Sequence, residues 1–158
     1  MHGNEGKREY KRFNWELVDA ACFIIADRIR ADHPDYKEKF AGVVAFPRGG
    51  LIPATLLAHM LDLDIVMTTS ELDLQVEHDV EGFGRGELFH GKYLLIDDIS
   101  DSGETFADYI ASYSDLIKAG DIEFVTAAIC YRPGTAYMPD YTIQDAFDKW
   151  VIFPWEQS

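Results

Sequence analysis

The chain has 158 residues, the size of one ordinary domain, and 47% of them are hydrophobic, so a core can form. Its formal net charge at pH 7 is −14. Such a charge repels nucleic-acid phosphates and anionic membranes, and we expect neither as a partner. No apolar run is long enough to cross a bilayer, and residues 1–12 lack the apolar stretch of a secretory signal. We therefore expect a cytoplasmic protein in which residues 1–158 form a single domain.

The hydrophobic pattern predicts helices that alternate with strands. Asn14 is the expected N-cap of a first helix, which runs to about residue 31. The pattern predicts further helices over 51–61 and 104–118, and strands over 42–46, 65–68, 92–97 and 124–130. Continuous apolar strands between helices are typical of a parallel sheet with helices on both faces, so we predict an α/β fold. The tail over 141–155 is expected to add two short strands.

Two other features bear on the organisation of the chain. Cys22 and Cys130 each lie in an apolar stretch and lack the spacing of a metal site, so we expect both to be reduced core residues. The segment 69–91 has no regular pattern and is rich in acidic residues and glycines. A loop of this length inside a compact domain is usually functional.

In open parallel sheets, ligands bind at the carboxyl ends of the strands. The loops that leave such ends are 47–50, 99–105 and 131–135. Asp97 and Asp98 end the strand before the second loop, where one carboxylate can reach a ligand's vicinal hydroxyls and the other a metal's water shell. Hydroxyls, a glycine and a helix start follow, which is how a backbone cradle for a phosphate is built. The residues of this cradle are Ser100, Asp101, Ser102, Gly103, Glu104 and Thr105.

Three simpler interpretations compete for this motif. Two acidic residues at a strand end are often only solvated. The spacing of Asp97, Asp98 and Asp101 also fits the aspartate-rich metal motif of prenyl synthases, but that motif lies on helices of large all-helical proteins. A phosphatase nucleophile of the haloacid-dehalogenase type needs two aspartates separated by one residue, whereas here they are adjacent. The complete string is far more specific than any of its parts.

The string from Leu94 to Thr105 closely resembles the signature with which type I phosphoribosyltransferases bind 5-phosphoribosyl 1-pyrophosphate (PRPP). Ser102 stands where threonine is commoner in that family, which keeps the hydroxyl. The resemblance extends over residues 14–156 and implies the type I phosphoribosyltransferase fold with a small C-terminal hood. It also implies that Asp97 and Asp98 hold the ribose hydroxyls and Mg²⁺, which Asp98 would bind partly through water. Residues 100–105 would bind the 5′-phosphate.

The same resemblance assigns residues to the purine and to the pyrophosphate group. Asp101 would face N7 of a purine and act as the general base. Arg48 and Gly49 would bind pyrophosphate, in an Arg-Gly-Gly-Leu loop that is typical of the xanthine-guanine branch. In that family the loop often contains a non-proline cis peptide, which we expect near Arg48–Gly49. Taken alone, the loop is equally a plain strand-to-helix turn with a surface arginine.

Three residues near the end of the chain resemble the family's purine pocket. Arg132 stands where 6-oxopurine enzymes carry a lysine that donates to the purine O6, and by itself it would be a surface arginine. Trp150 would stack on the base, and the backbone of Val151 would read the ring edge. Trp155 is expected to be a core residue instead.

The function that the resemblance implies is transfer of the phosphoribosyl group of PRPP to xanthine, guanine or hypoxanthine, with release of pyrophosphate, in a homodimer or homotetramer. The alternative is a non-catalytic regulator that binds PRPP or nucleotides on the same fold. The segment 69–91 resembles the family's mobile lid but departs from its pattern. It has Thr69 and Ser70 without a tyrosine, and Arg85 is its one fixed positive charge.

Overall fold

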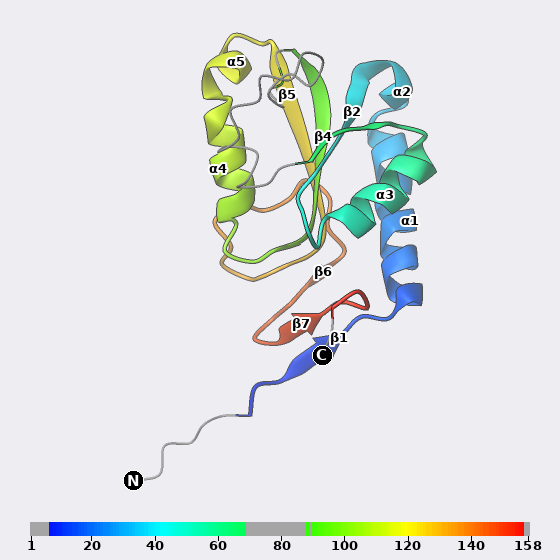
Figure 1. Cartoon of the computed structure of the whole chain (residues 1–158), viewed down its shortest axis with the longest axis vertical. Coiled ribbons are helices and arrows are strands. Elements are labelled where there is room, and N and C mark those ends of the chain that lie inside the picture. The colour runs from blue at the N-terminus through cyan, green and yellow to red at the C-terminus, as the bar shows by residue number, and fades with distance from the viewer. Residues whose placement is uncertain (1–6, 69–87, 89, 157–158) are drawn as a thin grey trace, which may run out of the picture.

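The computed structural model describes residues 7–68, 88 and 90–156 (Figure 1). At its centre lies a five-stranded sheet with the order β3-β2-β4-β5-β6, in which every pair of neighbours is parallel. Its strands are β2 (Phe40–Ala45), β3 (Ile65–Thr68), β4 (Gly91–Ser100), β5 (Ile122–Tyr131) and β6 (Gln144–Asp145). The predicted parallel α/β class is therefore confirmed.

Helices cover both faces of the sheet, as Figure 1 shows in a view along its edge. The two on one face are α1 (Trp15–Asp32) and α3 (Leu51–Leu61), and the two on the other are α4 (Glu104–Ser112) and α5 (Ser114–Lys118). A single turn, α2 (Tyr36–Lys39), leads from α1 into β2. No helix among the described residues is long and apolar enough to cross a membrane.

The central strand β4 explains why its sequence is apolar without interruption. Leu94 and Ile96 pack into the core under α1 and α3, while Leu95 between them packs into the second core under α4. All three side chains are fully buried. A strand with helices on both faces has no solvated side, so the alternation of apolar and polar residues is lost. The residues at the carboxyl end of β4 are therefore positioned by a strand that is buried on both faces.

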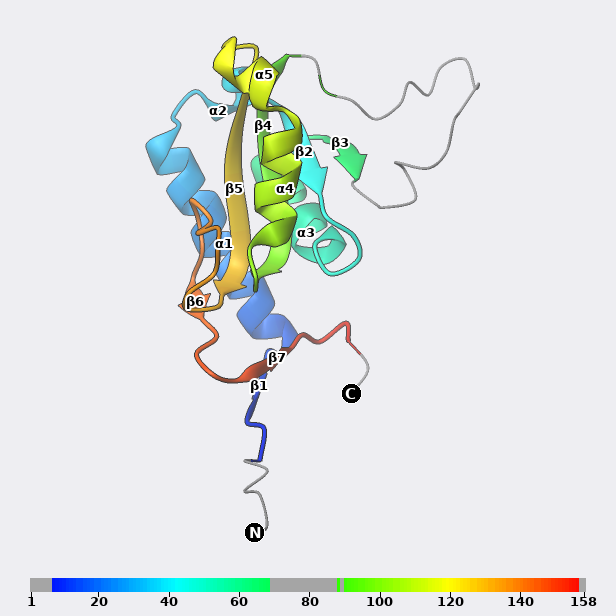
Figure 2. The ribbon, with the colours of Figure 1, turned by 90° about the vertical axis from the view of Figure 1, so that its left-hand side faces the viewer.

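A small second sheet forms the hood. β1 (Tyr10–Arg12) pairs in parallel with β7 (Trp150–Ile152), so segments from the two ends of the sequence lie side by side. Figure 2 shows this pair beyond the carboxyl ends of β4 and β5. Trp155 stacks on Phe153 with 4.7 Å between ring centroids and packs, partly buried, against the edge of the core for which it was predicted.

Most predicted elements form, and four differ in extent. The strand predicted over 42–46 is β2, which begins at Phe40 and ends at Ala45. The helix predicted over 104–118 is divided at Tyr113 into α4 and α5. β4 and β5 are longer than predicted, and α2 and β1 were not predicted. The expected N-cap is confirmed, because Asn14 Oδ1 accepts a hydrogen bond from Leu17 N at 2.8 Å. Cys22 and Cys130 are buried free thiols, as predicted.

Candidate functional site

The loop after β2 lies directly against the end of β4. A Cβ on Gly49 would overlap the carboxylate of Asp98, and one on Gly50 would overlap the backbone of Phe46 and Ile96. Only glycine allows so close an approach. The sequence Arg-Gly-Gly is thus explained by packing, and Gly49 and Asp98, predicted to act on the same substrate, are in contact.

The cis peptide bond expected near Arg48–Gly49 lies one residue earlier, between Pro47 and Arg48. Arg48 itself is exposed at the edge of the site. Its guanidinium forms no salt bridge with any of the residues that the structure describes. It is therefore available to an anionic ligand.

Asp97 and Asp98 form a half-buried carboxylate pair at the end of β4. Asp97 Oδ1 accepts a hydrogen bond from Asp98 N, and Asp98 Oδ1 accepts one from Ile99 N, both at 2.8 Å. Burial raises the pKa of both carboxyl groups, and the neighbouring charge of Asp98 raises the pKa of Asp97 further. No lysine or arginine in the described ranges forms an ion pair with either group. The described residues thus supply no cation to balance the charge that this pair carries when it is ionised.

The next loop leads from β4 into α4. Gly103 begins the helix with a φ of 83°, in the left-handed region, and Glu104 N donates to Ser102 Oγ at 3.2 Å. Asp101, Ser102, Glu104 and Thr105 are exposed around the buried Gly103. A helix's first amides have no acceptor within the helix, so this loop offers N–H groups to an anion.

Ser100 differs from the other predicted phosphate ligands. Its side chain is 2% exposed, and Ser100 Oγ donates to Tyr137 O at 2.7 Å. Its hydroxyl therefore supports the loop from beneath, and only its backbone remains for the predicted contact. The support that residues 135–137, after β5, give to the phosphate loop was not predicted. Ala136 N donates to Ser102 O at 2.8 Å, and Thr135 and Tyr137 leave no room for a side chain at Gly103. No sequence pattern marks this supporting role.

Arg132, at the end of β5, binds two other segments. Its Nε donates to Asp101 Oδ1 at 2.6 Å, and its Nη1 donates to the carbonyl oxygens of Phe147 at 2.8 Å and Lys149 at 3.0 Å. The structure therefore brings Arg132 and Asp101 together, as predicted from their assignment to one substrate. Its contact with the hood backbone was not predicted.

The hood places Trp150 at the surface and Val151 inside. The indole of Trp150 is 47% exposed, and the guanidinium carbon of Arg8 lies 4.6 Å from its ring centroid. The backbone of Trp150 is held by β1, because Trp150 N donates to Glu9 O at 2.8 Å. Val151 is 7% exposed, so only its backbone is suited to contact a ligand. Arg8 was not predicted, since nothing in its sequence neighbourhood points to Trp150.

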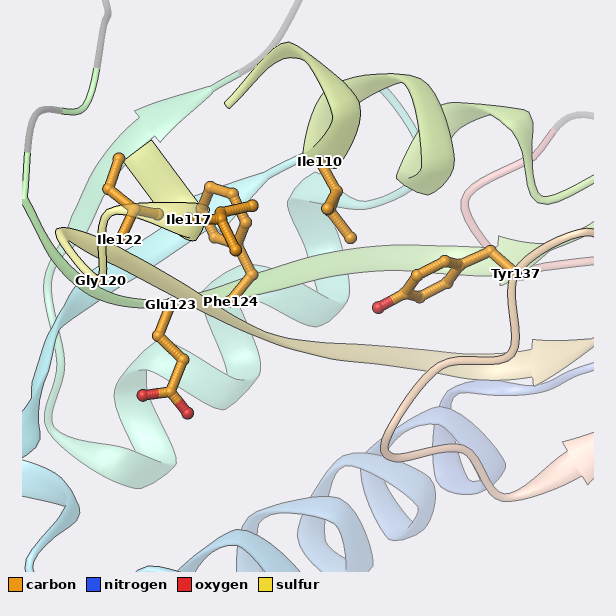
Figure 3. Close-up of a pocket in the computed structure, with 7 residues that line it drawn as sticks. All are labelled: Ile110, Ile117, Gly120, Ile122, Glu123, Phe124 and Tyr137. Carbon is orange, nitrogen blue, oxygen red and sulfur yellow. The ribbon is translucent and has the colours of Figure 1, made fainter. Parts of the chain in front are cut away.

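A cavity of about 410 Å³ lies elsewhere, between α4, α5 and the beginning of β5 (Figure 3). Ile110, Ile117, Ile122 and Phe124 give it an apolar lining. It is at the amino end of β5, whereas all predicted site residues are at the carboxyl ends, so we do not assign it to the site.

The lid predicted over 69–91 falls mostly outside the described residues. Within the described ranges, no group of three or more His, Cys, Asp or Glu residues could hold a metal.

Comparisons with known proteins agree with this geometry, although no family model matches the chain. The xanthine-guanine phosphoribosyltransferase of Vibrio parahaemolyticus serotype O3:K6 is 29% identical over 153 residues, which cover 91% of this chain and 87% of that protein. The crystal structure of a purine phosphoribosyltransferase from Pyrococcus horikoshii has a TM-score of 0.69 at 28% identity, covering 94% of this chain and 95% of that one. The Helicobacter pylori xanthine-guanine-hypoxanthine phosphoribosyltransferase has a TM-score of 0.68 at 19% identity, over 94% of each chain. The predicted fold is confirmed.

Proposed function

The chain belongs to the type I phosphoribosyltransferases, and from this premise we propose that it transfers the 5-phosphoribosyl group of PRPP to xanthine, guanine or hypoxanthine. The similarity to purine phosphoribosyltransferases extends over almost the whole chain, which supports an enzyme of purine salvage. No feature of the described residues favours the regulatory alternative.

One observation supports the assignment of the site. Three loops meet at the carboxyl edge of the sheet: Gly49 touches Asp98, and Arg132 binds Asp101. We propose that these loops supply a pyrophosphate loop, a ribose-binding carboxylate pair, a phosphate cradle and a base pocket, which adjoin at this edge of the sheet. We assign pyrophosphate to Arg48 and Gly49, and the 5′-phosphate to the loop over 100–105.

In the proposed reaction, the bond from C1 of the ribose to pyrophosphate breaks while a purine ring nitrogen bonds to C1. Displacements at this carbon pass through an oxocarbenium-like state. Asp97 and Asp98 hold the ribose hydroxyls, and their negative charge stabilises the cation. Asp101 accepts the proton that the purine loses. Trp150 stacks on the base, which contributes about 1–3 kcal/mol in comparable contacts, and Arg132 and the backbone of Val151 face the ring edge.

Mg²⁺ suits the carboxylate pair by its chemistry. Two half-buried carboxylates with raised pKa values and no ion-pair partner among the described residues are stabilised by a divalent cation. Mg²⁺ is typically held by one or two carboxylates, with water and substrate phosphates completing its shell. When bound, it would neutralise charge on the pyrophosphate, and Asp98 would hold it partly through water.

We also propose a cytoplasmic location and a homodimer or homotetramer. The buried thiols of Cys22 and Cys130 are free, as is usual in a reducing compartment. Light scattering of the purified protein measures its mass in solution, and a single-chain mass would contradict the proposed assembly.

An assay of the purified protein tests the reaction. It is incubated with PRPP, Mg²⁺ and guanine, xanthine, hypoxanthine or adenine in turn, and nucleotide and pyrophosphate are measured. We expect equal amounts of both products with at least one 6-oxopurine, and no product with the doubly substituted Asp97→Asn, Asp98→Asn protein. Absence of product with every base would contradict the proposed enzymatic activity. PRPP binding measured by calorimetry would then support the regulatory alternative.

A further inference from the structure

Arg132 contacts two parts of the site that are otherwise separate in the sequence. Through Nε it binds Asp101 in the loop after β4, and through Nη1 it binds the backbone carbonyls of Phe147 and Lys149 at the entry to the hood. Its side chain is 26% exposed and that of Asp101 is 49% exposed, so these hydrogen bonds lie at the surface of the site. Hydrogen bonds with a charged partner are roughly twice as strong as neutral ones.

The surrounding backbone holds all three partners in place. Arg132 N donates to Ser100 O at 2.9 Å, which fixes Arg132 beside the strand that precedes Asp101. On the other side, Ala146 N donates to Tyr131 O at 2.7 Å, and Lys149 N donates to Ala146 O at 3.1 Å. The second bond closes a turn that directs two carbonyl oxygens toward Arg132.

The chemistry of arginine suits this task. A guanidinium carries N–H donors that point in fixed, different directions in one plane, whereas a lysine ammonium is a single point charge. Nε and Nη1 can therefore serve Asp101 and the hood together. Nε binds one carboxylate oxygen, Oδ1, and among the described residues no hydrogen bond is made to Oδ2 of Asp101. That oxygen is left for the purine.

We propose that Arg132 is a positioning residue that orients Asp101 toward the purine and fixes the hood over the site. Its role toward Asp101 rests on the proposed function, whereas its role in the hood does not. This differs from a role as a purine ligand alone, because its main effects would then be exerted through other residues.

Hydrogen exchange of the protein without ligands tests the contact with the hood. The variant is Arg132→Lys, and the matched control is Arg30→Lys, because Arg30 likewise binds one carboxylate, that of Asp27, and one backbone carbonyl, that of Met60. We expect amides in the segment 145–151 to exchange at least about tenfold faster in Arg132→Lys, since a lost charged hydrogen bond contributes at least 1.5 kcal/mol. The control should leave this segment unchanged. Equal exchange in the wild type and Arg132→Lys would overturn this part of the proposal, whatever the enzyme's activity.

A double-mutant cycle tests the orientation of Asp101. If Arg132 acts through Asp101, Arg132→Lys should lower kcat about tenfold in the wild type and hardly at all in the Asp101→Asn protein. The KM for PRPP should stay within about twofold of wild type, because Arg132 contacts only the side chain of Asp101 in the cradle and none of its backbone N–H groups. Multiplicative losses in the double variant would instead assign Arg132 an independent contact with the base. Absence of turnover in the wild type would contradict the proposed function and leave the exchange result standing.

Discussion

Asp101 has surroundings unlike those of Asp97 and Asp98, although all three lie within five residues of one another. Its side chain is 49% exposed and is paired with Arg132. The adjacent carboxylates are half-buried and have no described cation beside them. An exposed carboxylate is accessible to a proton that a substrate loses, whereas burial raises the pKa of both adjacent carboxyl groups and makes a divalent cation favourable beside them. The three aspartates are therefore suited to two different tasks.

A substitution of Asp101 tests whether its carboxylate accepts the proton of the purine. We predict that Asp101→Asn lowers kcat at least about tenfold while PRPP binding persists, since an amide keeps the shape but cannot accept the proton. Steady-state kinetics and calorimetry with PRPP measure both effects. Asp108→Asn on the exposed side of α4 is the matched control, with expected wild-type turnover. Unchanged turnover of Asp101→Asn would remove Asp101 from the role of general base.

The burial of Asp97 and Asp98 lowers the stability of the protein when both carboxyl groups are ionised. A carboxyl group whose pKa is raised by folding contributes stability below its unfolded pKa, and this is lost as the pH rises through the folded pKa. The metal-free protein should therefore lose stability between about pH 4 and pH 8. Asp97→Asn keeps the Oδ1 acceptor for Asp98 N and removes one charge.

We predict that Asp97→Asn stabilises the metal-free protein by at least about 1 kcal/mol at pH 8 and by less at pH 5. Urea unfolding at both pH values measures the difference. The same variant should have little or no activity. A variant no more stable than the wild type at pH 8 would show that the pair is not strained by its burial.

At the scale of elements, local signals identify most of the fold. The helix cap at Asn14, the apolar runs of β2 and β4 and the glycines of the loop before α3 each predict the element that forms. The break at Tyr113 is not visible locally, because the ring of Tyr113 packs on Phe124 from β5. The carboxylate pair and cradle were recognisable because they are contiguous. Arg132 was recognised only in part, because Phe147 and Lys149 are distant in the sequence.

The cap of α1 makes a quantitative prediction at this scale. Asn14→Ala removes the acceptor for Leu17 N and should lower the free energy of unfolding by about 1 kcal/mol. Asn14→Asp, which retains an acceptor at the helix's positive end, is the control and should be near neutral. Thermal or urea unfolding measures both.

For the whole molecule, the charge of −14 opposes the approach of an anionic substrate. We predict that kcat/KM for PRPP rises as the ionic strength increases from about 0.01 to 0.1 M, because the Debye length falls from about 30 to 10 Å. Initial rates at subsaturating PRPP with constant free Mg²⁺ measure this. A steady fall over that range would mean that local positive groups outweigh the overall field.

The pairing of β1 with β7 was beyond prediction from sequence, since each strand is three residues long and its partner is at the other end of the chain. It also has a consequence for synthesis of the protein. The segment from α1 to β5 is translated with most of its core partners and can begin to fold as it leaves the ribosome. The hood cannot form then, because β1 must wait for β7, which follows all five strands of the main sheet. We therefore expect the loop proposed to bind the ribose phosphate to form before the hood proposed to bind the purine.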